Sequence, residues 1–486
     1  MNDNKALGFK RKALRKVIEA FDAGTLENAA YRIPFDVIPS DTKPDVRCCI
    51  YKERAVFRAR TLAALGCSVE ADDEATSLNE YSKQALLRKD TPEVPLTVLD
   101  IACKGCVKAR HIVTEACQGC LARACETACK FGAVKVENGR SHIDPEKCKN
   151  CGQCKATCPY NAITYVPVPC EQACPVDAIH KGSNGFAEID FDKCISCGHC
   201  MDACPFGAIM ERSQLIDILN AMKSPRKVCA VVAPSIVGQF DASLPKLMTA
   251  IKKAGFDKVT EVAEGAEVTT AHEAKELIER LERGDKFMTT SCCSAWMQAV
   301  KKHLPALQKY VSDTHSPMSY IAEIEKKNGF TVVFVGPCVS KRVEGREDPN
   351  VDYVMTYEEL GALLEARHID PAQCEETPLD GKISGESRYY GVTGGVAKAV
   401  EGAINGHRPI KMQTISGLDK KAMLMLNAYA RGVGDFQLLE VMSCKGGCIG
   451  GPCTLCSQAK VIKPIKDLAD ASPRVAPVFT DKKETK

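Results

Sequence analysis

The chain has 486 residues, with 65 Lys and Arg against 62 Asp and Glu, and it contains 28 cysteines. The length predicts two to four domains, and a net charge of only +3 excludes the concentrated basic excess of a typical nucleic-acid-binding protein. There is no apolar run of about 18 residues and no signal-peptide pattern, so we expect a cytoplasmic protein that contacts neither membrane nor nucleic acid. Thiols stay reduced in the cytoplasm, and so many cysteines therefore predict metal ligands rather than disulfides.

Residues 1–95 carry no motif that points to a reaction. The basic stretch KALGFKRKALRK near the start is interpreted as a solvated helix face, and the region is predicted to be helical, with no role assigned. Five cysteines outside any metal-binding pattern are interpreted as structural: Cys48, Cys49, Cys67, Cys229 and Cys374.

Two stretches further along have the cysteine spacing of bacterial ferredoxins. Residues 148–159 read CKNCGQCKATCP and residues 194–205 read CISCGHCMDACP, and both are C-x2-C-x2-C-x3-C-P runs of the kind that binds [4Fe-4S] clusters. Each run is followed by a similar stretch, YNAI or FGAI, which is predicted to start a strand. Structural zinc is the alternative, but zinc sites prefer isolated C-x2-C pairs, so we favour [4Fe-4S] binding.

Less regular cysteine groups lie ahead of these two runs. CQGCLARACETACKFGAV is a four-cysteine unit with a longer middle gap, PCEQACPVDAI supplies only a closing pair, and CKGC supplies a further pair. In paired clusters the fourth cysteine of each run ligates the other cluster, and this rule assigns the residues to four clusters. The predicted sets are Cys117, Cys120 and Cys125 with Cys158; Cys148, Cys151 and Cys154 with Cys129; Cys194, Cys197 and Cys200 with Cys174; and Cys103, Cys106 and Cys170 with Cys204.

For the last set, a separate site at Cys103 and Cys106 stays open as an alternative. We expect residues 96–215 to form a ferredoxin-like domain with up to four [4Fe-4S] clusters. Linked clusters of this kind carry electrons but do not by themselves catalyse a reaction, so a catalytic centre is expected elsewhere in the chain.

Residues 225–465 have the pattern of an α/β domain, and residues 466–486 are predicted to be a polar tail. The apolar runs KVCAVVAPSIV, GFTVVFVGPC and DFQLLEVMSC predict strands, and helical patterns such as AHEAKELIERLERG lie between them, which favours parallel sheets. Sites in such sheets form at the carboxyl ends of strands. Four cysteines that follow predicted strands can hold one more cubane: Cys293, Cys338, Cys444 and Cys448.

Lys341 follows one of these cysteines by three residues. Its ammonium group either serves an anionic ligand or cluster in the same pocket or forms a surface salt bridge. The sequence on its own leaves both interpretations open.

Three motifs in this domain resemble the signatures of [FeFe]-hydrogenases. They are TSCCSAW, GPCVSKRVEG and EVMSCKGGCIGG, and the segments APS at 233–235 and YYGVTGGV at 389–396 also match that family. The resemblance implies a divergent, monomer-type subgroup. The implied fold is an α/β two-lobed H-cluster domain with parallel or mixed sheets, preceded by an α+β bacterial-ferredoxin-like region with several clusters.

The resemblance also implies roles for individual residues. The four cysteines named above would ligate the [4Fe-4S] part of the H-cluster, and Cys448 would also bridge to a diiron unit that carries CO, cyanide and a dithiolate amine. Lys341 and the Pro234–Ser235 segment would hydrogen-bond the cyanides, and Met442 would pack beside the bridging region. Cys292, next to a ligand, would stay free of metal and exchange protons with the bridging amine.

A proton route to solvent is implied in the same way. It would run from Cys292 through Glu273, Ser312 and Glu276, with Arg280 near the exit. Glu273, Glu276 and Arg280 are spaced i, i+3 and i+7, so they share one face of a predicted helix, and hydrogen-bonded carboxyl and hydroxyl groups can relay protons. An amphipathic helix with exposed charges is the alternative that spacing alone would favour.

Several positions depart from the family pattern. Ser294 stands where that pattern has proline, Gly336 where methionine is usual, and Met318 where a glutamine is usual. Cys453 and Cys456 are additional, and we interpret them as inert thiols, with a ligand role as the alternative. These changes leave the ligand set intact but alter the packing expected around the diiron unit.

The resulting hypothesis is a hydrogenase that catalyses H2 ⇌ 2 H+ + 2 e−. The expected partners are a ferredoxin or similar small electron carrier and the maturation proteins that supply the diiron unit. A hydrogen sensor with the same cluster, and a non-catalytic iron–sulfur relative of the same superfamily, are the alternatives.

Overall fold

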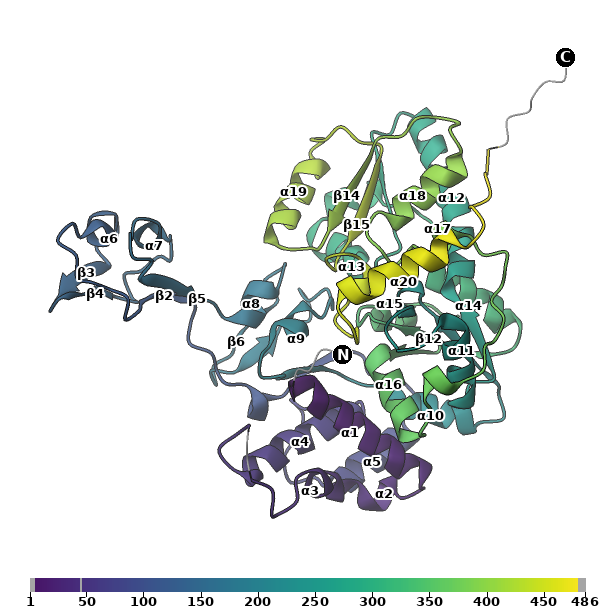
Figure 1. Ribbon diagram of the computed structural model, residues 1–486, viewed down its shortest axis with the longest axis horizontal. Helices are drawn as coiled ribbons and strands as arrows, with labels where there is room; N and C mark the ends of the chain where they lie inside the picture. The colour runs from purple at the N-terminus through teal and green to yellow at the C-terminus, as the bar shows by residue number, and fades with distance from the viewer. Residues whose placement is uncertain (1–4, 44–45, 480–486) are drawn as a thin grey trace.

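The computed structural model describes residues 5–43 and 46–479, which form three parts (Figure 1). N-terminal helices lie at the bottom of this view, a slender arm extends to the left, and an α/β body occupies the right. In the described part of the chain, no helix is long and apolar enough to cross a membrane.

Two parallel sheets form the centre of the α/β body. The larger has the strand order β10-β9-β12-β13 and the smaller has the order β11-β15-β14, with every pair parallel. The strands are β9 (Val228–Val232), β10 (Lys258–Glu261), β11 (Met288–Thr289), β12 (Thr331–Gly336), β13 (Tyr353–Thr356), β14 (Met412–Ser416) and β15 (Leu438–Met442). Strands β9, β12 and β15 are buried at every position, as expected of parallel strands covered on both faces. The predicted α/β fold with parallel sheets is therefore confirmed.

Helices cover both sheets and join them. The long helix α12 (Val262–Glu282) packs against α14 (Pro317–Lys327) beside the larger sheet and against α18 (Gly395–Ile404) beside the smaller one. The other helices of this part are α10 (Leu215–Lys223), α11 (Leu244–Lys253), α13 (Ser294–His303), α15 (Lys341–Glu347), α16 (Tyr357–Ala366), α17 (Gly385–Arg388), α19 (Lys420–Ala430) and α20 (Gln458–Asp470). Helix α20 extends to Asp470, past residue 465, where the catalytic domain was expected to end. Its buried residues Val461 and Ile465 pack it against the body.

The cysteine-rich region consists of short antiparallel strand pairs with one-turn helices between them. The pairs are β1 (Leu96–Val98) with β8 (Ile209–Glu211), β2 (Arg110–Val113) with β5 (Ile163–Val166), β3 (Val134–Glu137) with β4 (Arg140–Ile143), and β6 (Ile179–Lys181) with β7 (Ala187–Ile189). The helices are α6 (Ala124–Thr127), α7 (Gln153–Ala156), α8 (Pro169–Ala173) and α9 (His199–Ala203). Strands β2 to β5 with α6 and α7 form the arm, and α8 and α9 lie nearer the body (Figure 1).

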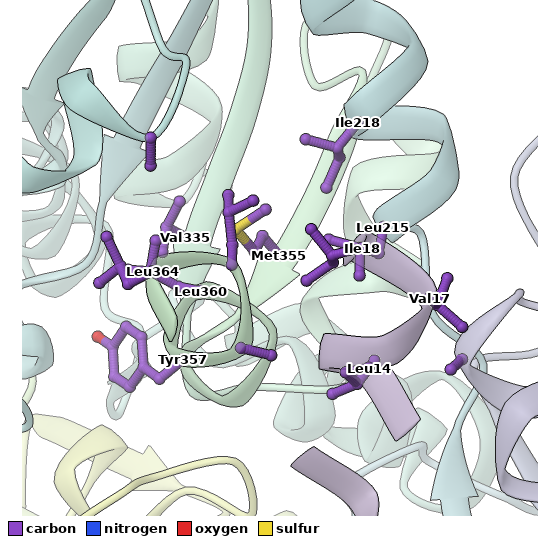
Figure 2. Close-up of a cluster of buried hydrophobic side chains, with 14 of the residues drawn as sticks. Leu14, Val17, Ile18, Leu215, Ile218, Val335, Met355, Tyr357, Leu360 and Leu364 are labelled. Atoms are coloured by element: carbon purple, nitrogen blue, oxygen red, sulfur yellow. The ribbon is translucent and has the colours of Figure 1, made fainter. Parts of the chain in front are cut away.

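The N-terminal helices share a hydrophobic core with the α/β body. They are α1 (Lys5–Asp22), α2 (Leu26–Ala29), α3 (Ile33–Val37), α4 (Ile50–Ala64) and α5 (Leu78–Leu87). Figure 2 shows Leu14, Val17 and Ile18 of α1 beside Leu215 and Ile218 of α10, and all five are at most 2% exposed. Burying a side chain of this size stabilises the fold by about 1.5–3 kcal/mol, so α1 is firmly attached to the body.

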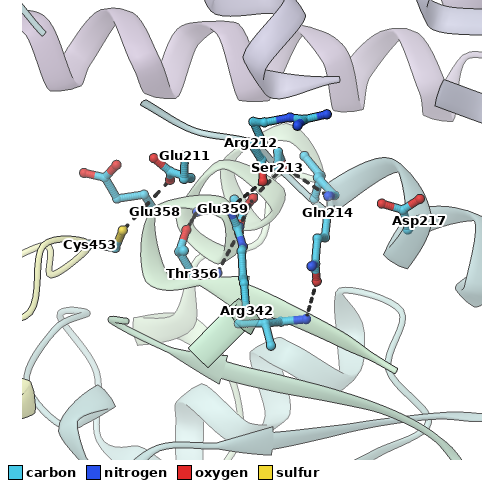
Figure 3. A network of polar contacts seen from close by, with 12 residues as sticks. Glu211, Arg212, Ser213, Gln214, Asp217, Arg342, Thr356, Glu358, Glu359 and Cys453 are labelled. Carbon is cyan, nitrogen blue, oxygen red and sulfur yellow. Dashed lines mark hydrogen bonds and ion pairs between the residues drawn. The ribbon is translucent and has the colours of Figure 1, made fainter. Parts of the chain in front are cut away.

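Buried ion pairs fix the same junction. Lys10 of α1 pairs with Glu211 at 2.7 Å and also with Glu358. Burial alone would lower the pKa of Lys10, but these two carboxylates raise it above its ordinary value. In Figure 3, Glu211 and Glu358 lie beside the pair of Arg342 with Glu359, which is 2.7 Å long. Removing one partner of a buried pair leaves an uncompensated charge, so these contacts favour one orientation of the N-terminal helices.

Candidate functional site

Four cysteines meet at the carboxyl ends of strands from both sheets. Cys293 follows β11, Cys338 follows β12, and Cys444 and Cys448 follow β15. Burial raises the pKa of Cys338 to about 11 and that of Cys448 to about 12, and in each case the neighbouring Cys293 adds to the shift. Cys444 is within electrostatic range of the other three. The structure therefore brings together the four thiols that the sequence selected for one cubane.

Glycines let two loops pack tightly around this group. Gly447 has a φ of +91°, and a Cβ atom there would lie 2.7 Å from the Gly391 carbonyl oxygen. Gly391 is also tightly packed, since its own Cβ would come within 3.2 Å of the Ser235 Cβ. The motifs CKGGC, YYGV and APS thus touch one another through closely packed glycines.

A hollow of about 70 Å³ opens beside the four thiols. Its wall combines apolar side chains with three thiols, an ammonium group and two hydroxyls: Pro234, Ser235, Cys292, Cys293, Met318, Lys341, Tyr390, Met442 and Cys448 are among the lining residues. The Ser235 hydroxyl lies 2.8 Å from the Tyr357 hydroxyl, which fixes its position. A few convergent polar groups on a mainly apolar wall are typical of a ligand site.

Lys341 is buried and charged, and it is held by a carboxylate that the sequence analysis did not single out. Its Nζ lies 2.7 Å from Glu344 Oε2 and donates to Ser316 Oγ at 3.1 Å. Glu344 also accepts hydrogen bonds from the hydroxyls of Ser294 and Ser316. Burial would lower the pKa of Lys341, but Glu344 raises it, so the ammonium form persists. The i, i+3 spacing of Lys341 and Glu344 was the available signal.

This network gives the departure at Ser294 a physical account. A proline at the start of helix α13 would have no hydroxyl group, whereas the hydroxyl of Ser294 donates a hydrogen bond to Glu344. The serine therefore adds a donor to the carboxylate that orients Lys341. The alternative interpretation of Lys341 as a surface salt bridge is only half right. The ion pair with Glu344 exists, but the Lys341 side chain is only 11% exposed and so does not lie on the open surface.

Cys292 is a partly buried thiol beside an unusual carboxyl group. Burial raises its pKa well above the ordinary value, and Glu273 and Cys293 add to the shift. Glu273 is fully buried on α12. Its Oε1 accepts from the Ser291 N–H at 3.3 Å, and its Oε2 has no partner among the described residues. Burial raises the pKa of Glu273 to about 8, so this group can give up or take a proton near neutral pH.

The remaining residues of the expected route run to the surface. Ser312 Oγ donates to Glu276 Oε2 at 2.6 Å, and Arg280 pairs with Glu276 at 2.6 Å and with Asp313 at 3.0 Å. The Asp313 side chain is 93% exposed. Within the described residues, no hydrogen bond joins Cys292 to Glu273 or Glu273 to Ser312, so the route is interrupted on both sides of Glu273. Asp313, absent from the sequence-based route, supplies its solvent end.

The accessory cysteines also group as the spacing predicted. Cys154 is influenced by Cys148, Cys129 and Cys151, and its thiol pKa is raised mainly by burial. Cys200 and Cys197 both interact with Cys194 and Cys174. Cys170 interacts with Cys204 and Cys106, and Cys106 with Cys103. These thiols are thus close enough to form the expected sets, including the set that draws on the remote CKGC pair, and the ligand assignment stays a prediction.

The first arm set is connected through neighbouring residues. Ser141 N donates to Cys117 Sγ at 3.4 Å, and Cys125 Sγ donates to Ser141 Oγ at 3.6 Å. The Thr157 hydroxyl donates a hydrogen bond to the Ala124 carbonyl at 3.5 Å. Thr157 precedes Cys158 and Ala124 precedes Cys125, so this contact joins the two cysteine segments. In the described part of the chain, no three His, Cys, Asp or Glu side chains form a site for a single metal ion. A cubane differs from such a site because each thiolate binds a separate iron.

A local turn of the backbone follows the closing cysteine of each ferredoxin-like motif. The third residue after each closing cysteine lies in the left-handed region, and these residues are Gly132, Asn161, Asp177 and Gly207. That turn lets the next N–H reach back to the thiol, as Ala133 does to Cys129 at 3.2 Å and Ala178 does to Cys174 at 3.2 Å. Such N–H···S bonds stabilise a thiolate and tune a bound cluster.

Cys453 and Cys456 lie apart from the four-thiol group. Cys453 Sγ is 3.9 Å from Glu211 Oε1 and fully buried, and Cys456 Sγ donates to the Gln239 carbonyl at 3.4 Å. Both thiols therefore have protein partners.

Comparison with known proteins agrees with this arrangement. Residues 226–452 match the family model "Iron only hydrogenase large subunit, C-terminal domain". Residues 141–164 match a 4Fe-4S binding domain, and residues 164–215 match the LdpA Fe-S cluster-binding domain.

Iron hydrogenase 1 of Clostridium pasteurianum is 30% identical over 375 residues, which cover 64% of each chain. The NADP-reducing hydrogenase subunit HndD of Solidesulfovibrio fructosivorans is 27% identical, with 68% of this chain and 62% of that protein covered. The chain thus spans slightly less than two thirds of these relatives. Protein NAR1 of Arabidopsis thaliana, whose name is not that of a hydrogenase, is 23% identical over 50% of this chain and 68% of its own.

A solved [FeFe]-hydrogenase structure aligns with 55% of this chain and 91% of its own, at 20% identity and a TM-score of 0.43. Homology is therefore inferred from the sequence match over the α/β body and from the cluster-binding domains ahead of it. Residues 226–452 thus match the iron-only ([FeFe]) hydrogenase large-subunit family, and the chain is a divergent homologue of [FeFe]-hydrogenases with iron–sulfur cluster-binding domains before that region.

Proposed function

We propose that the chain is a hydrogenase that catalyses H2 ⇌ 2 H+ + 2 e− at an H-cluster in residues 225–465. The observation that carries this proposal is the pairing of a free, partly buried thiol with a protonatable carboxyl. Cys292 borders the hollow beside the four thiols, and Glu273 stands next to it with a pKa near 8. An electron-transfer protein has no need of such a pair, whereas proton reduction requires groups that deliver protons to the reacting centre, and this pair can do so.

The residues around the hollow fit an anionic diiron unit. Cys293, Cys338, Cys444 and Cys448 would hold its [4Fe-4S] partner, and the ammonium of Lys341 would offer a charge-assisted hydrogen bond to a cyanide ligand. When bound, the diiron unit would supply the iron that binds hydrogen. The mainly apolar wall would keep water away from it.

Proton movement can be described from the residues of the chain. Cys292 would hold a proton at its Sγ atom, and after it gives that proton up, Glu273 would replace it, since this carboxyl is largely protonated at pH 7 because its pKa is raised. Ser312 and Glu276 would continue the path, and the Arg280–Asp313 pair would open it to solvent. Water would complete the route between Cys292 and Glu273 and between Glu273 and Ser312.

Electrostatic contacts between cysteine sets suggest the order of the electron path. Cys197 is within range of Cys338 and Cys444, so the set with Cys174 would be nearest the H-cluster. Cys170 is within range of Cys200, so the set with Cys103 would come next. The arm would hold two further clusters and meet a ferredoxin or similar one-electron carrier.

A non-catalytic iron–sulfur relative is the second candidate, and the similarity to Protein NAR1 supports considering it. A hydrogen sensor is a third. A proton route that ends at exposed Asp313 favours turnover over both, since neither alternative must move protons to solvent at each cycle.

The test uses anaerobic protein with all cubanes assembled and a synthetic or matured diiron unit added. Infrared bands of CO and cyanide, together with viologen-linked hydrogen turnover, are expected. Protein that retains the cubanes but neither takes up the diiron unit nor turns over hydrogen would contradict the proposal.

A further inference from the structure

The N-terminal helices contact the cysteine set Cys103, Cys106, Cys170 and Cys204. Helix α4 packs against the one-turn helix Asp100–Ala102 that leads into Cys103. From the same helix, the side chain of Arg60 extends to the loop after Cys204. A Cβ atom on Gly207, three residues beyond Cys204, would lie 3.0 Å from Arg60 Nη2.

Arg60 is a buried cation whose guanidinium is incompletely paired. The residue is 2% exposed, and its Nη1 lies 3.3 Å from the Met210 sulfur. Its Nη2 has no hydrogen-bond partner among the described residues. Glu53 is the carboxylate that acts on Arg60, but it already pairs with Arg47 at 2.9 Å. A buried charge left in this condition is costly unless an anion neutralises it.

The surroundings of Arg60 favour an anion. A hollow of about 560 Å³ adjoins Arg60 and Cys103, and the charged residues that line it are all basic: Lys5, Arg47, Lys52, Arg60 and Lys104. The Cys204 thiol is within electrostatic range of Arg60. A cubane held by four thiolates carries net negative charge, and nearby charge and hydrogen bonds to sulfur set its potential.

We propose that Arg60 is the counter-charge of an iron–sulfur cluster held by Cys103, Cys106, Cys170 and Cys204, and that the N-terminal helices serve to hold it there. This inference rests on the proposed cluster ligands but not on hydrogen turnover. Arg60 favours the reduced, more negative form of the cluster and so raises its reduction potential. The buried contacts of α1 explain how the helices stay in place, since Lys10, Leu14 and Ile18 attach them to the body.

The experiment compares Arg60→Met, which removes the charge at similar size, with Arg60→Lys, which keeps it. Arg58→Met is the matched control, because Arg58 lies on the same helix but pairs with Asp72. The four accessory signals are followed by EPR-monitored redox titration of anaerobic protein, with iron content measured alongside. The signal lost on replacing Cys103 and Cys106 by serine identifies the cluster in question.

Arg60→Met is expected to shift that one signal to lower potential and leave the others unchanged, while Arg60→Lys and Arg58→Met keep the wild-type potential. An unshifted signal at full iron content in Arg60→Met would overturn the inference and leave the ligand proposal intact. If replacing Cys103 and Cys106 removes no signal, the ligand proposal and the inference both fail. Should Arg60→Met lose iron, Arg60→Gln decides by the same titration. A shift in protein that turns over no hydrogen would still support the inference.

Discussion

Replacing Glu273 by glutamine tests the central carboxyl group of the proton route. The pKa of Glu273 is raised from 4.5 to about 8 by burial. In the unfolded chain the proton is lost near pH 4.5, whereas the folded chain keeps it to about pH 8, so the folded state binds more protons between these values. Stability from this group is therefore complete below pH 4.5 and is lost as the pH rises through 8.

The size of the effect follows from the pKa difference. At about 1.36 kcal/mol per pKa unit, the folded state loses about 3 kcal/mol of stability between pH 4.5 and pH 7 because of Glu273. The loss reaches about 5 kcal/mol above pH 8, where this carboxyl is ionised. Glutamine has nearly the same shape, keeps an acceptor for the Ser291 N–H, and does not ionise. The Tm of Glu273→Gln should therefore gain on that of the wild type as the pH rises from 5 to 8.

The assay is thermal unfolding of anaerobic protein with its cubanes but without the diiron unit, at several values of pH. Glu323→Gln is the control, because Glu323 pairs with Lys327 at the surface. With the diiron unit added, Glu273→Gln should also lose turnover by about 10²–10⁴, the usual contribution of a positioned acid–base group. Parallel pH profiles of Tm for the variant and the wild type would refute the assigned burial, and undiminished turnover would refute its role in the route.

Three further outcomes are expected. Cys292→Ala should assemble every cluster yet turn over hydrogen about 10²–10⁴ more slowly, whereas Cys293→Ala should fail to assemble the catalytic cubane; infrared bands and turnover separate the two, and reversed phenotypes would exchange the assignments. Lys341→Ala should retain the cubanes but bind the diiron unit poorly, because a charge-assisted hydrogen bond is worth about 1.5–3 kcal/mol; CO and cyanide bands at full occupancy would contradict this. Replacing Cys103 and Cys106 together should lower the iron content by one cubane, about four irons, and leave the H-cluster bands intact; an unchanged iron content would show that the remote pair holds no cluster.

Local patterns were enough to predict much of the architecture. The apolar runs that became β9, β12 and β15 are short, continuous and followed by a small residue, proline or cysteine, so both their type and their ends could be read from the sequence. The spacing within each ferredoxin run is likewise local, because the left-handed turn after the closing cysteine and its N–H···S bond need only five consecutive residues.

The sequence by itself determined the spacing of the ferredoxin-type cysteine runs, the parallel sheets and the residues at the ends of their strands, because each follows from periodicity or spacing along a short segment. Tertiary structure alone decided what those segments meet. Glu344 orients Lys341 only because Ser294 and Ser316 arrive from two other helices, and Arg60 reaches the loop after Cys204 only because α1 and α4 pack on the body. Contacts between residues far apart in the chain depend on how whole elements pack, and no local pattern in the sequence records that.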